Sequence, residues 1–115
     1  MLIKIINQTQ NTVLSENTLL AQTFTTRAKG LLGKKQLQDG SGLLIKPCKQ
    51  IHSVGMKFNF DAVFITKDKT VCYLHPNMKP GQISAYINQS LYVLELPAGR
   101  IQETDTCIGD VIEIN

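Results

Sequence analysis

The sequence of 115 residues contains no tryptophan, and aromatic residues make up only 6% of it. It also lacks any run of about 20 apolar residues, the length that a membrane-spanning helix needs, so no membrane span is expected. Low-complexity stretches, repeats of fixed period and Gly/Ser or Pro linkers are absent as well. These absences predict a single domain over residues 1–115, whose 43% of hydrophobic residues can form one core.

The chain also lacks a large excess of charge of one sign. The formal net charge is +3, and the lysines are spread along the chain rather than gathered into a block. The densest basic stretch, from Arg27 to Lys35, has no aromatic residue after Phe24 on which a base could stack. The composition therefore argues against a nucleic-acid partner and favours a small molecule or another protein.

Cysteine is scarce, with only Cys48, Cys72 and Cys107. An odd number of cysteines without an export signal indicates free thiols rather than a disulfide framework. A secretory signal would open with a basic end and an apolar block, whereas residues 1–7 alternate like a strand. We therefore expect a cytoplasmic protein with reduced thiols.

Short segments of β-type residues separated by turn residues fill most of the chain. Phe60–Thr66 is the clearest strand, apolar on both faces apart from Asp61, and residues 91–96 form the second clearest. Further strands are expected at Leu2–Asn7 and at residues 12–14, 18–22, 43–45, 71–74 and 111–114. Residues 75–77 are expected to break regular structure, and one short helix is expected near residues 24–32. This pattern predicts a mainly β fold, with α+β as the marginal case: a compact β-sandwich or a jelly-roll-like, partly closed barrel of about seven to nine short strands.

Four segments together resemble a known family. They are residues 27–32 (RAKGLL), 52–58 (HSVGMKF), 61–65 (DAVFI) and 94–99 (LELPAG). Their order and spacing are similar to the family catalogued as domain of unknown function 192, also called uncharacterised protein family 0127. The most specific mark is the last segment followed by Gly109-Asp110. The resemblance implies a compact, mostly β, jelly-roll-like domain, and it implies no established activity and no catalytic residues.

Both histidines lie near a cysteine and a methionine, in the sets Cys48, His52, Met56 and Cys72, His75, Met78. Thiolate, imidazole and thioether ligands would suit copper(I) or zinc if the two segments converged. An alternative hypothesis is therefore a soft-metal site of Cys48, His52, Cys72 and His75, or a Cys/His-dependent enzyme in which a histidine activates a thiol. Against both, cysteine and methionine commonly fill cores, and the sequence supplies no third, orienting residue. No catalytic residue is assigned, and no cofactor is expected unless copper or zinc binds.

Two carboxylates stand among apolar neighbours, Asp61 before Val63 and Glu95 after Val93. Alternation along a strand places each on a face that otherwise looks buried, where an ionised carboxylate must be paired or hydrogen-bonded. They would form an acid/base pair if they lay within about 5 to 10 Å of each other. As structural anchors instead, Asp61 would bind backbone amides of the preceding turn, and Glu95 would pair with Arg27 or Lys57.

The leading interpretation is a ligand- or partner-binding module. Its groove or rim is expected to be lined by His52, Met56, Lys57, Asp61 and Glu95, which place a few polar groups over an apolar floor. Whether the chain is also an enzyme is left open by the sequence. A third hypothesis is a protein that adds a strand to a partner through an exposed sheet edge.

Overall fold

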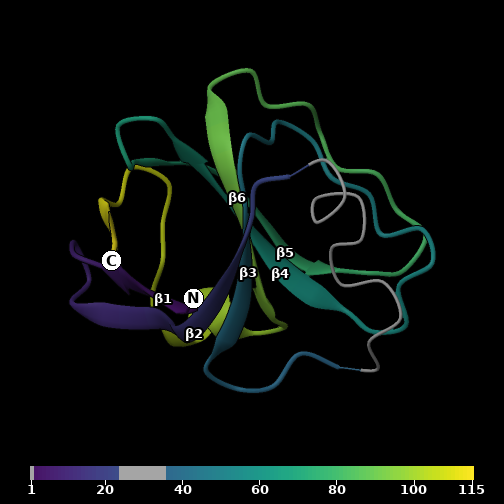
Figure 1. Ribbon diagram of the computed structural model, residues 1–115, viewed down its shortest axis with the longest axis horizontal. Helices are drawn as coiled ribbons and strands as arrows, with labels where there is room; N and C mark the ends of the chain where they lie inside the picture. The colour runs from purple at the N-terminus through teal and green to yellow at the C-terminus, as the bar shows by residue number, and fades with distance from the viewer. Residues whose placement is uncertain (1, 24–35) are drawn as a thin grey trace.

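The computed structural model describes residues 2–23 and 36–115, which form seven strands and one short helix (Figure 1). In chain order these are β1 (Leu2–Asn7), β2 (Thr12–Ala21), β3 (Ser41–Ile45), β4 (Phe60–Thr66), β5 (Val71–Met78), β6 (Ser90–Pro97), α2 (Arg100–Glu103) and β7 (Ile112–Ile114). The prediction of a mainly β fold is confirmed. The helix expected near residues 24–32 lies outside the described residues. Within the described ranges, no helix has the length and apolarity to cross a membrane.

All seven strands belong to one sheet, in the order β5-β4-β6-β3-β2-β1-β7. The named pairs are antiparallel except β2 and β3, which run parallel. The sheet is not closed, but its two edges meet at one end. There Thr70 bridges Val111, and the Ile112 amide donates to the Lys69 carbonyl at 2.8 Å. Because the strands form a single curved sheet, the partly closed barrel describes the fold better than two stacked sheets.

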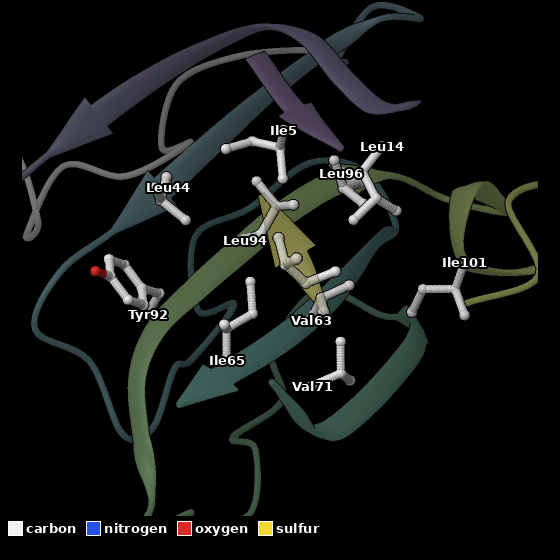
Figure 2. Packing of buried hydrophobic residues seen from close by; sticks show 11 residues of the cluster. Ile5, Leu14, Leu44, Val63, Ile65, Val71, Tyr92, Leu94, Leu96 and Ile101 are labelled. Carbon is white, nitrogen blue, oxygen red and sulfur yellow. The ribbon is translucent and has the colours of Figure 1, made fainter. Parts of the chain in front are cut away.

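The sheet is apolar on both of its faces. All seven strands and α2 contribute to the inner-face cluster, whose side chains converge in Figure 2. Its members are Ile5, Leu14, Leu44, Val63, Ile65, Val71, Tyr92, Leu94, Leu96, Ile101 and Ile112. The outer-face cluster consists of Ala21, Leu43, Ile45, Ile51, Met56, Phe60, Ala62, Phe64, Met78 and Val93. Burial on both faces explains why β4 and β6 read as nearly continuous apolar runs.

Two loops lie over the outer face, residues 46–59 and 79–89, and Figure 1 shows both on the side of β4 and β5. The first loop contributes Ile51 and Met56 to the outer-face cluster. Backbone hydrogen bonds hold the loops to each other: the Ser84 amide donates to the Ile51 carbonyl at 2.9 Å and the Ser53 amide to the Gln82 carbonyl at 2.8 Å. The loops therefore cover this face as one connected layer.

The strands differ from the expected ones in two places. Residues 12–14 and 18–22 were expected as separate strands, but β2 is continuous because its polar middle is satisfied: Thr18 and Ser15 are buried, and the Thr18 hydroxyl donates to Ser15 Oγ at 2.6 Å. The expected break at residues 75–77 was wrong, since β5 runs on to Met78. Pro76 is tolerated because β5 is an edge strand, where a missing amide donor costs no ladder hydrogen bond.

A bulge in β5 faces Asp61 of β4. Phe60 pairs with Met78 and Ala62 with His75, so β5 carries one residue more than β4 over this stretch. Asn77 adopts a positive φ of 50°, and its amide donates to Asp61 Oδ1 at 2.8 Å. The Asp61 carboxylate thus takes the place of the ladder partner that the bulge removes.

The second oxygen of Asp61 holds the start of α2. The amides of Gly99 and Ile101 donate to Oδ2 at 3.1 and 2.8 Å. Gly99 has a φ of 95°, a conformation that a side chain disfavours. Asp61 is 1% exposed, so three backbone amides satisfy a fully buried carboxylate. These amides belong to β5 and to the start of α2, and not to the preceding turn as expected.

Replacing Asp61 with alanine should therefore destabilise the fold strongly. Each buried group left without its partner costs about 1–3 kcal/mol, so Asp61→Ala should lower the free energy of unfolding by roughly 3 kcal/mol or more, measured by urea denaturation. The matched control is Asp68→Ala, because Asp68 is exposed in the turn after β4 and should change stability by less than about 0.5 kcal/mol. Equal losses in the two variants would contradict the anchoring role.

Candidate functional site

The register of the sheet aligns three residues across the outer face. Glu95 of β6 pairs with Ala62 of β4, and Ala62 pairs with His75 of β5. Directly opposed residues on neighbouring strands point to the same face. Glu95 and His75 therefore flank Ala62 with their Cα atoms about 10 Å apart, which is two inter-strand spacings. We call Glu95, Ala62 and His75 the outer-face row.

Glu95 is the buried acid of this row, with 5% of its surface exposed. Its neighbours across the ladder are Leu43 and Ala62, and Val93 precedes it on the same face. Within residues 2–23 and 36–115 its carboxyl group has no hydrogen-bond or ion-pair partner, and burial raises the pKa of Glu95 to about 8. Near neutral pH, the group is therefore mostly protonated.

His75 stands on the opposite side of Ala62. Its Nδ1 is the one side-chain nitrogen or oxygen atom in the described part of the chain that is fully removed from solvent and has no hydrogen-bond partner. Ala62, the residue of β4 between them in the register, has a side chain of a single methyl group. Within residues 2–23 and 36–115, the row therefore presents two polar groups without protein partners beside the apolar outer-face cluster.

The five residues expected to line a groove fall into three places. Met56 and Glu95 share the outer face. His52 and Lys57 are exposed on the covering loop, where His52 Nδ1 accepts from the Val54 amide at 3.3 Å. Asp61 pairs with Leu96 on the inner face. Since Asp61 and Glu95 lie on opposite faces of the sheet, the two carboxyl groups do not form an acid/base pair.

The residues of the soft-metal hypothesis do not form a cluster. In the described ranges, no three His, Cys, Asp or Glu side chains are placed to hold one metal ion. The Cys72 thiol donates to the Phe64 carbonyl and the Cys48 thiol to the Gln50 carbonyl, both at 3.4 Å. Burial raises the pKa of Cys72, which favours the thiol over the nucleophilic thiolate. The copper or zinc site of Cys48, His52, Cys72 and His75, and the Cys/His-dependent enzyme, stay predictions.

Sequence reasoning identified Glu95 but missed its alignment with His75. His75 was expected in a break rather than in a strand, so it had no sheet face. Its face follows from the extension of β5 beyond Leu74 and from the irregularity in the β4–β5 register between Phe64 and Ile65. The usable signal was the edge position of the strand, which permits a proline within it.

Residues 5–114 match the model of the DUF192 family, described as an uncharacterized ACR. This chain belongs to the DUF192 family. The resemblance read from the RAKGLL, HSVGMKF, DAVFI and LELPAG segments is therefore confirmed. The family description assigns no activity to the DUF192 domain.

Two solved structures share the fold of this DUF192 domain. One is a protein of unknown function from Novosphingobium aromaticivorans DSM 12444, with a TM-score of 0.84 and 22% identity, covering 98% of this chain and 84% of that one. The other, from Sinorhizobium meliloti 1021, is described as a candidate transcription regulator, with a TM-score of 0.79 and 25% identity, covering 96% of this chain and 90% of that one. Comparison with curated proteins gives no match. The likeness therefore establishes the fold.

The buried acid should make the stability of the DUF192 domain depend on pH. The pKa of Glu95 rises from 4.5 to about 8 on folding, so the unfolded chain ionises first as the pH rises. The free energy of unfolding should therefore fall between about pH 5 and pH 8, by at most about 1.4 kcal/mol per pH unit, and level off above that range. Urea denaturation across this range measures the slope.

The comparison that isolates Glu95 is with Glu95→Gln, which keeps the shape of the protonated acid and should show a flatter profile. Glu103→Gln alters an exposed acid and should keep the slope of the natural chain. Asp110 does not interfere: burial opposes its ionisation, but hydrogen bonds from Asn7, the Cys107 amide and Gln10 together lower its pKa. Identical slopes in the natural chain and Glu95→Gln would show that Glu95 ionises normally.

Proposed function

We propose that this DUF192 domain is a binding module for a small, largely apolar molecule carrying a basic nitrogen, and that the outer-face row is its site. The observation that carries the proposal is the carboxyl group of Glu95, which is buried among apolar side chains without a partner in the described part of the chain.

A buried carboxyl group without a partner calls for an explanation. Buried polar groups in proteins are nearly always hydrogen-bonded, and leaving one unsatisfied opposes folding. Asp61, one residue before Ala62 on β4, follows this rule with three amide donors. In the described ranges, the Glu95 carboxyl group, which keeps slight contact with solvent, has no partner, and His75 Nδ1 on the same face is fully buried without one. A ligand that bonds to both groups would satisfy the two unpaired groups together.

The chemistry of the row selects the class of ligand. A carboxylate accepts hydrogen bonds, and a neutral imidazole accepts at one ring nitrogen. A protonated amine offers several N–H donors and a positive charge, which an ionised carboxyl group stabilises in a poorly hydrated site. The apolar side chains of Leu43 and Val93 beside Glu95 suit a hydrocarbon body. The separation of about 10 Å between the flanking Cα atoms limits the head group to a few heavy atoms.

The proposed location of the protein is the cytoplasm. Cys48, Cys72 and Cys107 form no disulfide, which supports a reducing compartment. The protein described as a candidate transcription regulator does not extend the proposal to nucleic acid, because the modest net charge of this chain favours no phosphate-backbone surface.

Binding can be tested with benzylamine as the probe and benzyl alcohol as its neutral match. Titration followed by amide chemical shifts at pH 7 should give an affinity for benzylamine about tenfold higher than for benzyl alcohol, a difference of about 1.4 kcal/mol. Calorimetry in buffers of different ionisation enthalpy should show proton release on amine binding, because Glu95 loses its proton when the ammonium group arrives.

Three variants test whether the amine binds at Glu95 and His75. Glu95→Gln should abolish the preference for the amine, His75→Ala should weaken amine binding, and Glu103→Gln should leave it unchanged. Circular dichroism confirms that each variant is folded. Equal affinity for the two probes, an unchanged preference in Glu95→Gln, or the absence of saturable binding up to about 10 mM would refute the proposal.

A further inference from the structure

A second unusual group of side chains lies at one end of the inner face, around Tyr92. Tyr92 is 7% exposed and is the one aromatic side chain in the described inner-face cluster. Figure 2 shows its ring at the margin of the cluster, with the hydroxyl group pointing away from the other labelled side chains. The ring therefore closes this end of the apolar core and presents its polar atom outward.

Two lysines are held over this ring. Ile45 pairs with Val93, so Lys46, the next residue, comes level with Tyr92 at the end of β3, and its Nζ lies 5.4 Å from the ring centroid. Lys69 reaches the same ring from the turn between β4 and β5, with Nζ 5.5 Å from the centroid. Contact of an ammonium group with the face of an aromatic ring restricts a flexible side chain. The ring thus gathers two positive charges that the sequence separates by 23 positions.

Neither lysine forms an ion pair with another of the described residues. In the described part of the chain, the ion pairs are Lys4 with Glu16 and Arg100 with Glu103, and neither involves Lys46 or Lys69. The turn that carries Lys69 also holds Lys67 and Asp68, both exposed. Lys49 adds a further ammonium group near the start of β6, where it donates to the Ser90 carbonyl at 3.1 Å. This end of the barrel therefore combines several positive charges with a phenolic hydroxyl group that has no hydrogen-bond partner among the described residues.

We propose that Lys46, Lys69 and the Tyr92 hydroxyl form a binding site for the phosphate group of a small molecule. Two ammonium groups and one hydroxyl group supply donors to a compact dianion, and the anion offsets the repulsion between two lysines held at one ring. A small phosphate fits better than a single-stranded nucleic acid, because Tyr92 is too buried to serve as a stacking platform for a base. The site is distinct from the outer-face row, since Tyr92 faces the inner core.

Inorganic phosphate is the first probe, titrated at constant ionic strength with sodium chloride as the balancing salt. We expect saturable amide shifts at residues around Lys46, Lys69 and Tyr92, with a dissociation constant in roughly the millimolar range that two lysines and a hydroxyl group can give. Lys46→Gln and Lys69→Gln should each weaken phosphate binding about tenfold, and Tyr92→Phe, which keeps the ring, should weaken it less. Lys79→Gln is the matched control, because Lys79 is exposed on the loop after β5 and should bind phosphate normally.

Three results would overturn this proposal. The first is an equal response to chloride alone at the same ionic strength, and the second is unchanged binding in both Lys46→Gln and Lys69→Gln. The third is binding of a short single-stranded oligonucleotide more tightly than phosphate and unaffected by Lys46→Gln, which would indicate a polyanion surface elsewhere. Amide spectra of each variant without phosphate show whether the fold is kept, so a loss of binding cannot be mistaken for unfolding.

Discussion

The carboxylate of Asp61 is the interaction on which the arrangement of this sheet depends. It reaches across the inner face to the bulge of β5 through Asn77 and to the start of α2 through Gly99 and Ile101. With this anchor, β5 can continue past Pro76 as an edge strand despite an interrupted ladder. Directly before the bulge, His75 lies opposite Ala62, in register with the Val63–Leu74 and Phe64–Tyr73 pairs. The Asp61 carboxylate on the inner face therefore anchors β5 immediately beyond the residue that lies opposite Ala62 on the outer face.

Asp61 and Glu95 differ in whether the described part of the fold supplies hydrogen-bond donors to the carboxyl group. The two acids belong to neighbouring, paired strands, and both are almost fully buried. Amide donors surround Asp61, so its charge is satisfied within the fold. Apolar side chains surround Glu95, and burial raises its pKa to about 8. Burial alone thus does not mark a functional acid, whereas burial without a partner requires another explanation.

The sequence predicted much of the fold because strands buried on both faces give long apolar runs. Residues 60–66 and 91–96 were recognised in this way, and alternation correctly placed Glu95 on the face of Val93. The alternation that found Glu95 could not tell whether a donor faces it, since donors come from segments distant in the chain. The continuity of β2 and of β5 also escaped, because each depends on contacts across the sheet. Site residues on one strand are therefore predictable, and the residues opposite them are not.

The group around Tyr92 could not be predicted from the sequence either, because its members are far apart in the chain. No spacing in the sequence links Lys46 or Lys69 to Tyr92, and each lysine alone would be taken as a solvated surface charge. Their meeting follows from strand order, because β6 lies between β3 and β4: Lys46 at the end of β3 comes level with Tyr92, and Lys69 reaches the ring from the turn after β4. Strand order also separates this group from the outer-face row, since Tyr92 and Glu95 alternate to opposite faces of β6. A single strand thereby carries a buried acid on one face and a ring that orders two lysines on the other.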